Sequence, residues 1–266
     1  MADGRRAAVL GSPISHSLSP ALHRAAYADL GLDWTYDTFD VTEEQLPAFL
    51  DGLDSSWAGL SLTMPLKECV IPLMSEVDED ALAIASVNTV LPCPGGWRGT
   101  NTDIHGIVQS LREAGVAEGP RTATVLGAGA TARSAIAALA RLGIDEVTVC
   151  ARRSEPADEL AALATRFGLH ATTAALDPGP QPMLADIVIS TLPGTAAAPW
   201  AVAAPLASGT LLDASYHPWP SALAGAWGGA AVASGRDMLL WQAVEQVRLM
   251  TGREPSVDSM RAALPA

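Results

Sequence analysis

The chain has 266 residues, of which 49% are hydrophobic and 17% charged. This composition excludes a disordered or solvated spacer, because such segments are poor in apolar residues and rich in charge. The length predicts two domains or one large one. A formal net charge of −13 argues against binding to nucleic acids or to membrane surfaces, since both carry negative charge themselves.

The three cysteines, Cys69, Cys93 and Cys150, are widely separated and form no C-x-x-C pair. They predict neither a disulfide framework nor a metal site, and a reducing cytoplasmic compartment fits them best. The apolar run 7–10 is too short for a signal peptide. The uncharged stretch 187–212 contains three prolines, which would break a membrane-spanning helix. No membrane association is expected.

Strand and helix patterns alternate through the first hundred residues. Strands are predicted over 7–11, 34–39, 57–62, 87–91 and 97–100, and helices over 19–30 and 43–50. Ser19 directly precedes a proline and Thr63 stands two residues before one, so we expect both to cap helices. Alternating elements of this kind predict a mostly parallel sheet covered by helices on both faces.

The second half begins with a helix over 104–113 and then follows the order strand, glycine turn, helix, strand. These four elements span 122–126, 127–132, 133–142 and 146–151, and further strands are predicted over 186–190, 210–214 and 230–233. Helices over 238–250 and 257–264 would return to the first domain. We therefore predict an α/β chain with one domain over 1–103 and 237–266 and a Rossmann-type domain over 104–236.

The segment from Gly127 to Ala132 fits a dinucleotide-binding fingerprint. Gly127 allows a tight turn, Gly129 lets a pyrophosphate approach the backbone, and Ala132 lets the helix pack close to the strand. Because a strand precedes this segment and a helix and a second strand follow it, we favour dinucleotide binding over a glycine-rich turn that only packs.

Arg152 and Arg153 follow the second strand of this unit, where NAD-binding proteins place an acidic residue for the ribose hydroxyls. Two guanidinium groups match a 2′-phosphate in charge and in the geometry of their donors. The pair predicts NADP rather than NAD. The alternative is a solvated loop after a strand.

Lys67 is the only lysine among sixteen basic residues. It would supply an amine whose pKa can be tuned for acid–base work, which arginine cannot do; the alternative is that one lysine codon survived by chance. Other polar side chains stand at predicted strand ends, namely Ser17, Ser19, Thr63, Asn88 and Asp103. The two serines suit a small polar anion or polyol, although each of the five alone also suits a turn or a cap.

Seven segments, in order along the chain, resemble the signature motifs of the shikimate dehydrogenase family. They are Gly11–His23, Ser61–Lys67, Ala85–Thr89, Gly99–Asp103, Gly127–Ala132, Asp213–Pro218 and Gly235–Gln242. The resemblance spans nearly the whole chain. It implies reversible NADPH-dependent reduction of 3-dehydroshikimate to shikimate in aromatic amino-acid biosynthesis, and we expect a monomer or a homodimer.

The resemblance also implies a role for each matching position. Lys67 and Asp103 would form the catalytic pair. The carboxylate and hydroxyl groups of the substrate would contact Ser17, Ser19, Thr63, Lys67, Asn88, Asp103, Tyr216 and Gln242. NADP would contact Gly127, Ala128, Gly129, Ala130, Ala132, Arg152, Arg153, Thr191, Leu192 and Met238.

The chemistry of the reaction gives Lys67 a double task. Hydride reduction of a ring ketone needs a proton for the developing alkoxide and a positive charge beside it, and an ammonium group supplies both. Asp103 would orient that group and hold a substrate hydroxyl. Which of the two residues transfers the proton is left open.

Two other functions compete with this interpretation. A quinate or dual quinate and shikimate dehydrogenase using NAD is disfavoured by Arg152 and Arg153, and by serine rather than threonine at position 19. A non-catalytic NADP-binding protein is disfavoured by the full set of polar site residues. Three departures from the family pattern remove no reacting group: Ser61-Leu62 in place of the common Asn-Val, Ile104 where glycine is frequent, and Ala151 where asparagine is usual.

Overall fold

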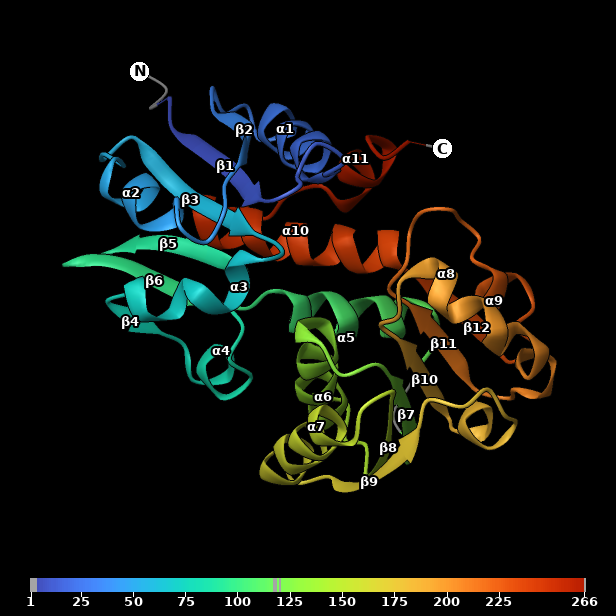
Figure 1. Cartoon of the computed structure of the whole chain (residues 1–266). Helices are drawn as coiled ribbons and strands as arrows, with labels where there is room; N and C mark the ends of the chain where they lie inside the picture. The colour runs from blue at the N-terminus through green and yellow to red at the C-terminus, as the bar shows by residue number, and fades with distance from the viewer. Residues whose placement is uncertain (1–3, 117–118, 120, 266) are drawn as a thin grey trace. The chain divides into compact units, whose positions relative to one another are not determined.

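The computed structural model describes residues 4–116, 119 and 121–265 (Figure 1). The chain divides into two compact units, here called unit 1 and unit 2. Unit 1 consists of Met1–Thr102 and Gln242–Ala266, and unit 2 of Asp103–Trp241. The boundaries predicted from the sequence lie after residues 103 and 236, whereas the two units divide after residues 102 and 241.

Unit 1 contains a six-stranded sheet in the order β2-β1-β3-β5-β6-β4. Its strands are β1 (Arg6–Gly11), β2 (Thr35–Asp40), β3 (Trp57–Leu62), β4 (Glu76–Val77), β5 (Thr89–Cys93) and β6 (Gly96–Thr100). Strand β1 runs parallel to β2 and β3, and β4 runs parallel to β6. Strand β5 is antiparallel to both β3 and β6. A tight turn joins β5 to β6, as the glycine pair at 95–96 predicts. The sheet is therefore mostly parallel, as expected.

Helices cover both faces of this sheet, and every residue of β3 is buried. They are α1 (Ser19–Asp29), α2 (Leu46–Asp51), α3 (Leu66–Cys69), α4 (Glu79–Ala83), α11 (Val257–Ala262) and the part of α10 (Gly235–Thr251) after residue 241. Figure 1 shows α11 beside α1, and the two helices are in contact. The carboxyl-terminal helices thus return to the first unit, as predicted.

The expected capping roles of Ser19 and Thr63 are wrong. Helix α1 has Leu18 at its N-cap and no side-chain cap, and the Ser19 amide donates to Ser17 Oγ at 3.3 Å. Helix α3 begins at Leu66, and its amide donates to the backbone carbonyl of Thr63 at 2.8 Å. In each case the helix starts one or more residues away from the position that the proline suggests, so the hydroxyl does not face the helix amides.

Unit 2 contains a six-stranded sheet in the order β12-β11-β10-β7-β8-β9, in which all neighbours are parallel. Its strands are β7 (Thr122–Leu126), β8 (Glu146–Ala151), β9 (His170–Ala175), β10 (Ile187–Ser190), β11 (Thr210–Asp213) and β12 (Ala231–Ser234). This order, with two halves winding outward from β7 and β10, is that of a dinucleotide-binding fold. The Rossmann-type sheet is confirmed.

Helix α6 (Ala130–Arg141) packs against both α5 (Asp103–Glu113) and α7 (Ser154–Arg166) in this unit (Figure 1). An apolar cluster of unit 2 lies under the short helices α8 (Gly194–Ala197) and α9 (Ala222–Gly225), around the fully buried Trp200. Helix α7 and strand β9 are absent from the sequence prediction. Strand β9 reads HATTAA and is mostly exposed, so it lacks the apolar alternation that marks a strand.

No helix within residues 4–116, 119 and 121–265 is both long and apolar enough to cross a membrane.

Candidate active site

Most of the predicted substrate-binding residues of unit 1 lie at one edge of its sheet. The strands β1, β3 and β6 end at this edge and the antiparallel β5 begins there. The Thr63 amide donates to the Leu10 carbonyl at 2.9 Å, and the Asn88 amide donates to the Thr100 carbonyl at 3.1 Å. These bonds bring the segments after β1 and β3 and before β5 together, at the edge where open α/β sheets bind ligands.

The segment after β1 presents Ser17 and Ser19. Ser19 is buried, and its carbonyl oxygen lies 2.9 Å from Nδ1 of His23 one turn further along α1. The His23 ring stacks on Tyr36 of β2 with a centroid distance of 4.0 Å. A carbonyl oxygen only accepts, so Nδ1 carries the proton and His23 is a neutral donor. Ser19 is therefore held through its backbone carbonyl, and its side chain also hydrogen-bonds with the Tyr36 hydroxyl.

Lys67 lies within the short helix α3, directly after the turn that carries Thr63. The side chain is partly exposed. The Lys67 carbonyl accepts a hydrogen bond of 2.8 Å from the Val87 amide. Because Val87 precedes Asn88 in the chain, this bond fixes the backbone of Lys67 next to the asparagine segment.

Asn88 and Gln242 meet through Thr102. The Asn88 side chain is buried, and its Oδ1 accepts from the Thr102 amide at 2.7 Å while its Nδ2 donates to Thr102 Oγ1 at 3.0 Å. Thr102 Oγ1 lies 3.5 Å from Oε1 of Gln242 on α10. Two predicted ligands from distant parts of the sequence are thus joined by one buried threonine.

A buried polar network behind this edge is absent from the predicted site. The Tyr36 hydroxyl donates to Ser61 Oγ at 2.6 Å, and Ser61 Oγ donates to Oε1 of Gln246 at 2.8 Å. Burial lowers the pKa of the neighbouring His23 to about 4. Two signals point to the network in the sequence: Ser61 is a polar residue within an apolar strand, and Gln246 follows Gln242 by four residues on the same helix face.

In unit 2 the glycine turn has the geometry that its sequence predicts. The Gly127 amide donates to the Cys150 carbonyl at 2.9 Å, and its φ of +108° is one that L side chains rarely adopt. A Cβ there would lie 2.4 Å from Thr191 Oγ1, whereas a Cβ on Gly129 would meet nothing within 4 Å. The space at Gly129 fits a pyrophosphate approaching the amino end of α6.

The other predicted cofactor residues surround this turn or lie further along unit 2. Ala128 and Ala130 complete the turn, Ala132 is fully buried, Leu192 follows Thr191 and is buried, and Met238 is buried on α10. Arg152 and Arg153 are exposed directly after β8.

The Thr191 amide and Oγ1 both lie 2.9 Å from the Leu126 carbonyl. Since Leu126 pairs with Cys150 and Ser190, these segments share the carboxyl edge of the sheet.

Two predicted substrate residues, Asp103 and Tyr216, belong to unit 2. Asp103 is the first residue of α5 and is buried, and Tyr216 follows β11 and is half-buried. The segment after β11 is anchored by Asp213, which accepts from Ser221 Oγ at 2.5 Å and from the Ser215 amide at 3.1 Å. Burial raises the pKa of Asp213 above its usual range. The pairing of Lys67 with Asp103 stays a prediction.

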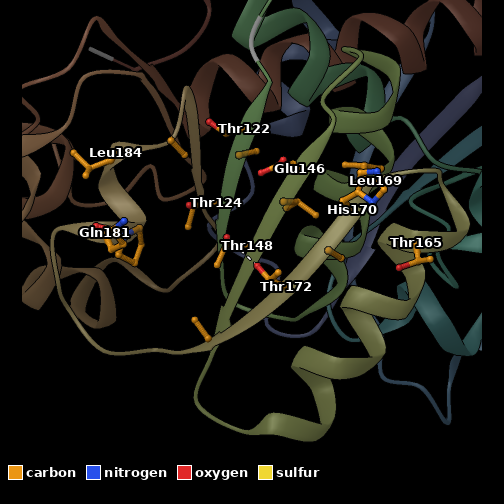
Figure 2. Close-up of a pocket in the computed structure, with 16 residues that line it drawn as sticks. Thr122, Thr124, Glu146, Thr148, Thr165, Leu169, His170, Thr172, Gln181 and Leu184 are labelled. Atoms are coloured by element: carbon orange, nitrogen blue, oxygen red, sulfur yellow. Dashed lines mark hydrogen bonds between the residues drawn. The ribbon is translucent and has the colours of Figure 1, made fainter.

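A pocket of about 770 Å³ lies in unit 2 toward the amino ends of β7, β8 and β9, opposite the strand ends that carry the glycine turn (Figure 2). Its floor carries Thr122, Thr148 and Thr172, and Oγ1 of Thr148 lies 3.2 Å from Oγ1 of Thr172. None of the predicted site residues lines it. Because α/β sheets bind ligands at the carboxyl ends of their strands, this pocket is distinct from the candidate site.

Comparison with known proteins finds relatives over nearly the whole chain. Residues 9–90 match the family model described as the shikimate dehydrogenase substrate binding domain, and residues 235–264 match the shikimate 5′-dehydrogenase C-terminal domain. A shikimate dehydrogenase (NADP(+)) from Methanothermobacter thermautotrophicus is 35% identical over 96% of this chain and 94% of its own length.

Two solved structures are similar over almost their full length. Shikimate dehydrogenase from Mycobacterium tuberculosis is 41% identical, with a TM-score of 0.91 over 97% of this chain and 98% of its own. The enzyme from Thermus thermophilus in complex with NADP(H) and shikimate is 33% identical, with a TM-score of 0.83 over 97% and 98% of the two chains. The likeness covers the sequence, the fold and the segments that carry the candidate site, and the chain therefore belongs to the shikimate dehydrogenase family.

Proposed function

We propose that the chain catalyses the reversible reduction of 3-dehydroshikimate to shikimate with NADPH. The observation that carries this conclusion is the similarity to NADP-dependent shikimate dehydrogenases over nearly all of the chain. Within it, most of the polar residues predicted for substrate lie at the ligand-binding edge of the unit 1 sheet, and most of those predicted for cofactor at the corresponding edge of the unit 2 sheet.

Substrate recognition falls to hydroxyl and amide side chains. Ser17 and Ser19 would bind the carboxylate, and Thr63, Asn88 and Gln242 the ring hydroxyls, together with Asp103 and Tyr216. Hydroxyls and amides both donate and accept, so they suit a polyol better than a row of cations would. The buried bonds of Asn88 to Thr102 support this role because they leave its amide with a defined orientation.

The chemical step is assigned to Lys67 and Asp103. NADPH would supply the hydride for the carbonyl carbon of the ring, and the carbonyl oxygen would then carry the developing negative charge. The Lys67 ammonium stabilises that charge and gives the oxygen its proton, while the Asp103 carboxylate orients the amine and accepts a bond from a substrate hydroxyl. In the reverse direction the neutral amine removes the proton from the hydroxyl.

Cofactor choice is assigned to unit 2. The glycine turn and the amino end of α6 would hold the pyrophosphate, and Arg152 and Arg153 the 2′-phosphate. Thr191, Leu192 and Met238 would border the nicotinamide. The exposed position of both arginines after β8 supports this choice, and the relatives named for NADP disfavour the NAD-dependent quinate enzyme.

We place this activity in a cytoplasmic monomer or homodimer. The three cysteines are free in the structure, which suits a reducing compartment.

A single spectrophotometric comparison tests the function. The purified chain is assayed at 340 nm with shikimate or quinate, each with NADP or NAD. We expect turnover with shikimate and NADP to exceed the other three combinations by at least about tenfold in kcat/KM. Preference for quinate with NAD would replace the proposal by its enzymatic alternative, and no turnover with any pair would favour a non-catalytic NADP-binding protein.

A further inference from the structure

Gln246 links the candidate substrate site to the interior of unit 1. It lies on α10, is 1% exposed, and has no role in the proposed function. Its Nε2 lies 2.9 Å from Thr89 Oγ1 and 3.3 Å from the Asn88 carbonyl oxygen. Its Oε1 lies 2.8 Å from Ser61 Oγ. The side chain therefore contacts a predicted substrate ligand and the residue that follows it.

The orientation of the Gln246 amide follows from its partners. A backbone carbonyl oxygen only accepts, so the NH₂ group must face Asn88 and Oε1 must face Ser61. Ser61 then donates its proton to Gln246 and accepts one from the Tyr36 hydroxyl, which lies 2.6 Å away. The positions of the protons along this chain of bonds are thus determined by one main-chain group.

The same logic extends to Thr89. Because its oxygen accepts a proton from Gln246, Thr89 directs its own proton to Oδ1 of Asn88 at 2.8 Å. That Oδ1 also accepts from the Thr102 amide at 2.7 Å, and Nδ2 of Asn88 donates to Thr102 Oγ1 at 3.0 Å. The oxygen end of the Asn88 amide is therefore held by these two short bonds, and Thr102 Oγ1 makes a longer contact with it at 3.2 Å.

We propose that Gln246 is a positioning residue that fixes the proton of Thr89 and so holds the Asn88 amide in the orientation that binds a substrate hydroxyl. This inference rests on the proposed function of Asn88 as a shikimate ligand. Without Gln246, the Thr89 hydroxyl can turn to Thr102 Oγ1, which is 3.3 Å away. Asn88 Oδ1 then loses one of its donors, and substrate binding weakens.

The orientation of Asn88 can be observed directly, because Asn88 and Asn101 are the only asparagines of the chain. Labelling the full chain with [¹⁵N]asparagine gives two side-chain NH₂ signals in NMR spectra. Asn101 donates to the Ser86 carbonyl at 2.8 Å and is the internal reference. We expect Gln246→Met and Thr89→Val to shift the Asn88 signal, Thr89→Ser to keep it near its wild-type position, and the Asn101 signal to stay unchanged.

Steady-state kinetics test whether this orientation matters for binding. Gln246→Met and Thr89→Val should raise KM for shikimate about tenfold, with kcat and KM for NADP within about twofold of wild type. Thr89→Ser, which keeps the hydroxyl, should bring KM for shikimate back to within about twofold. Ser110→Ala is the control: Ser110 is equally buried on α5, its hydroxyl donates to the Ile107 carbonyl at 3.1 Å, and neither KM should change.

The outcomes separate the inference from the function on which it rests. An unmoved Asn88 signal in Gln246→Met, or a moved signal with an unchanged KM for shikimate, overturns the inference. So does an equal rise of both KM values, which indicates general damage. If Gln246→Met does not fold, Ser61→Ala removes only one bond to Gln246 and should act in the same direction. If the wild type fails to oxidise shikimate, the proposed function fails, and the NMR spectra alone still decide whether Gln246 orients Asn88.

Discussion

The two units hold their predicted site residues in contrasting ways. In unit 1, Ser19, Asn88 and Gln242 are between 2% and 6% exposed, and Asn88 and Gln242 are joined through buried hydrogen bonds. In unit 2, Gly129, Arg152 and Arg153 are exposed, and the glycine turn offers backbone amides rather than side chains. These predicted substrate residues are thus part of the core of unit 1, whereas these predicted cofactor residues lie on the surface of unit 2.

This difference has an energetic consequence. A substitution in the buried network of unit 1 removes hydrogen bonds that stabilise the fold as well as bonds that orient ligands, because unpartnered buried polar groups are costly. A substitution among the exposed groups of unit 2 removes ligand contacts and leaves the fold intact. Binding and stability should therefore be coupled in the buried network of unit 1 and separable at the exposed groups of unit 2.

Lys67 should be an exception to this coupling of binding and stability, because it belongs to unit 1 but is partly exposed. Its replacement should also have the largest effect on activity. Lys67→Ala should lower kcat by at least ~10²-fold, the low end of general acid–base contributions, with a smaller change in KM for shikimate. Steady-state kinetics with shikimate and NADP measure both values. Asp103→Asn should also lower kcat.

Thermal unfolding provides the control for Lys67. Since its side chain is not part of the core, Lys67→Ala should melt within a few degrees of the wild type. Near-normal turnover by this variant would remove Lys67 from the proposed catalytic pair, and unchanged kinetics in Asp103→Asn would leave Lys67 acting alone.

The coupling in unit 1 should be visible as acid sensitivity through His23. Its pKa is lowered from 6.5 to about 4 by burial, so the unfolded chain binds a proton that the folded chain resists. The stability that neutral His23 contributes is complete above pH 6.5 and is lost as the pH falls toward 4, by up to about 3 kcal/mol. Urea unfolding at pH 7 and at pH 4.5 measures this difference.

His23→Asn isolates the contribution of that side chain. Asparagine keeps a donor near the position of Nδ1, so the bond to the Ser19 carbonyl is retained while the titration is removed. The variant should lose less free energy of unfolding between pH 7 and pH 4.5 than the wild type loses. His170→Asn, at an exposed position of β9, should not alter the slope; equal slopes in all three proteins would show that His23 does not titrate in this way.

The contrast between the units also explains what the sequence could predict. The strands at 122–126, 146–151 and 57–62 match their predicted ranges, because each is an apolar run bounded by turn residues. The glycine turn was predictable because a short segment determines both its conformation and its function. Local patterns therefore predict the glycine turn of unit 2 and the apolar strands of both units, but they miss the polar strand β9.

The buried network of unit 1 could not be predicted in the same way. Its bonds join residue 36 to 61 and 61 to 246, and such separations leave no periodic signal in the sequence. The caps expected at Ser19 and Thr63 failed for a related reason, since a proline near a hydroxyl residue predicts that a helix is close but not at which residue it begins. The candidate site residues stand out singly in the sequence, whereas the hydrogen bonds between them do not.

The separability of binding and stability in unit 2 can be tested at Arg152 and Arg153. Replacing both by alanine should raise KM for NADP about 10- to 100-fold, because two charge-assisted hydrogen bonds to the 2′-phosphate are lost. KM for NAD should stay the same, and so should the melting temperature, since both side chains are exposed. An equal loss with NADP and NAD would show that the pair does not read the 2′-phosphate.

The two glycines of the turn offer the finest test, because the same substitution should act differently at positions two residues apart. Gly127→Ala places a Cβ 2.4 Å from Thr191 Oγ1 at a φ of +108°, so it should destabilise the fold by about 1 to 2 kcal/mol as well as weaken NADP binding. Gly129→Ala has an ordinary φ of −93° and meets no atom within 4 Å. It should leave the melting temperature unchanged and raise KM for NADP several-fold, because the methyl group occupies the space where the pyrophosphate approaches the backbone. Thermal melts and NADP titrations of both variants decide the matter: a lowered melting temperature in Gly129→Ala, or unaltered NADP binding in it, would show that the open space at this turn serves packing rather than the cofactor.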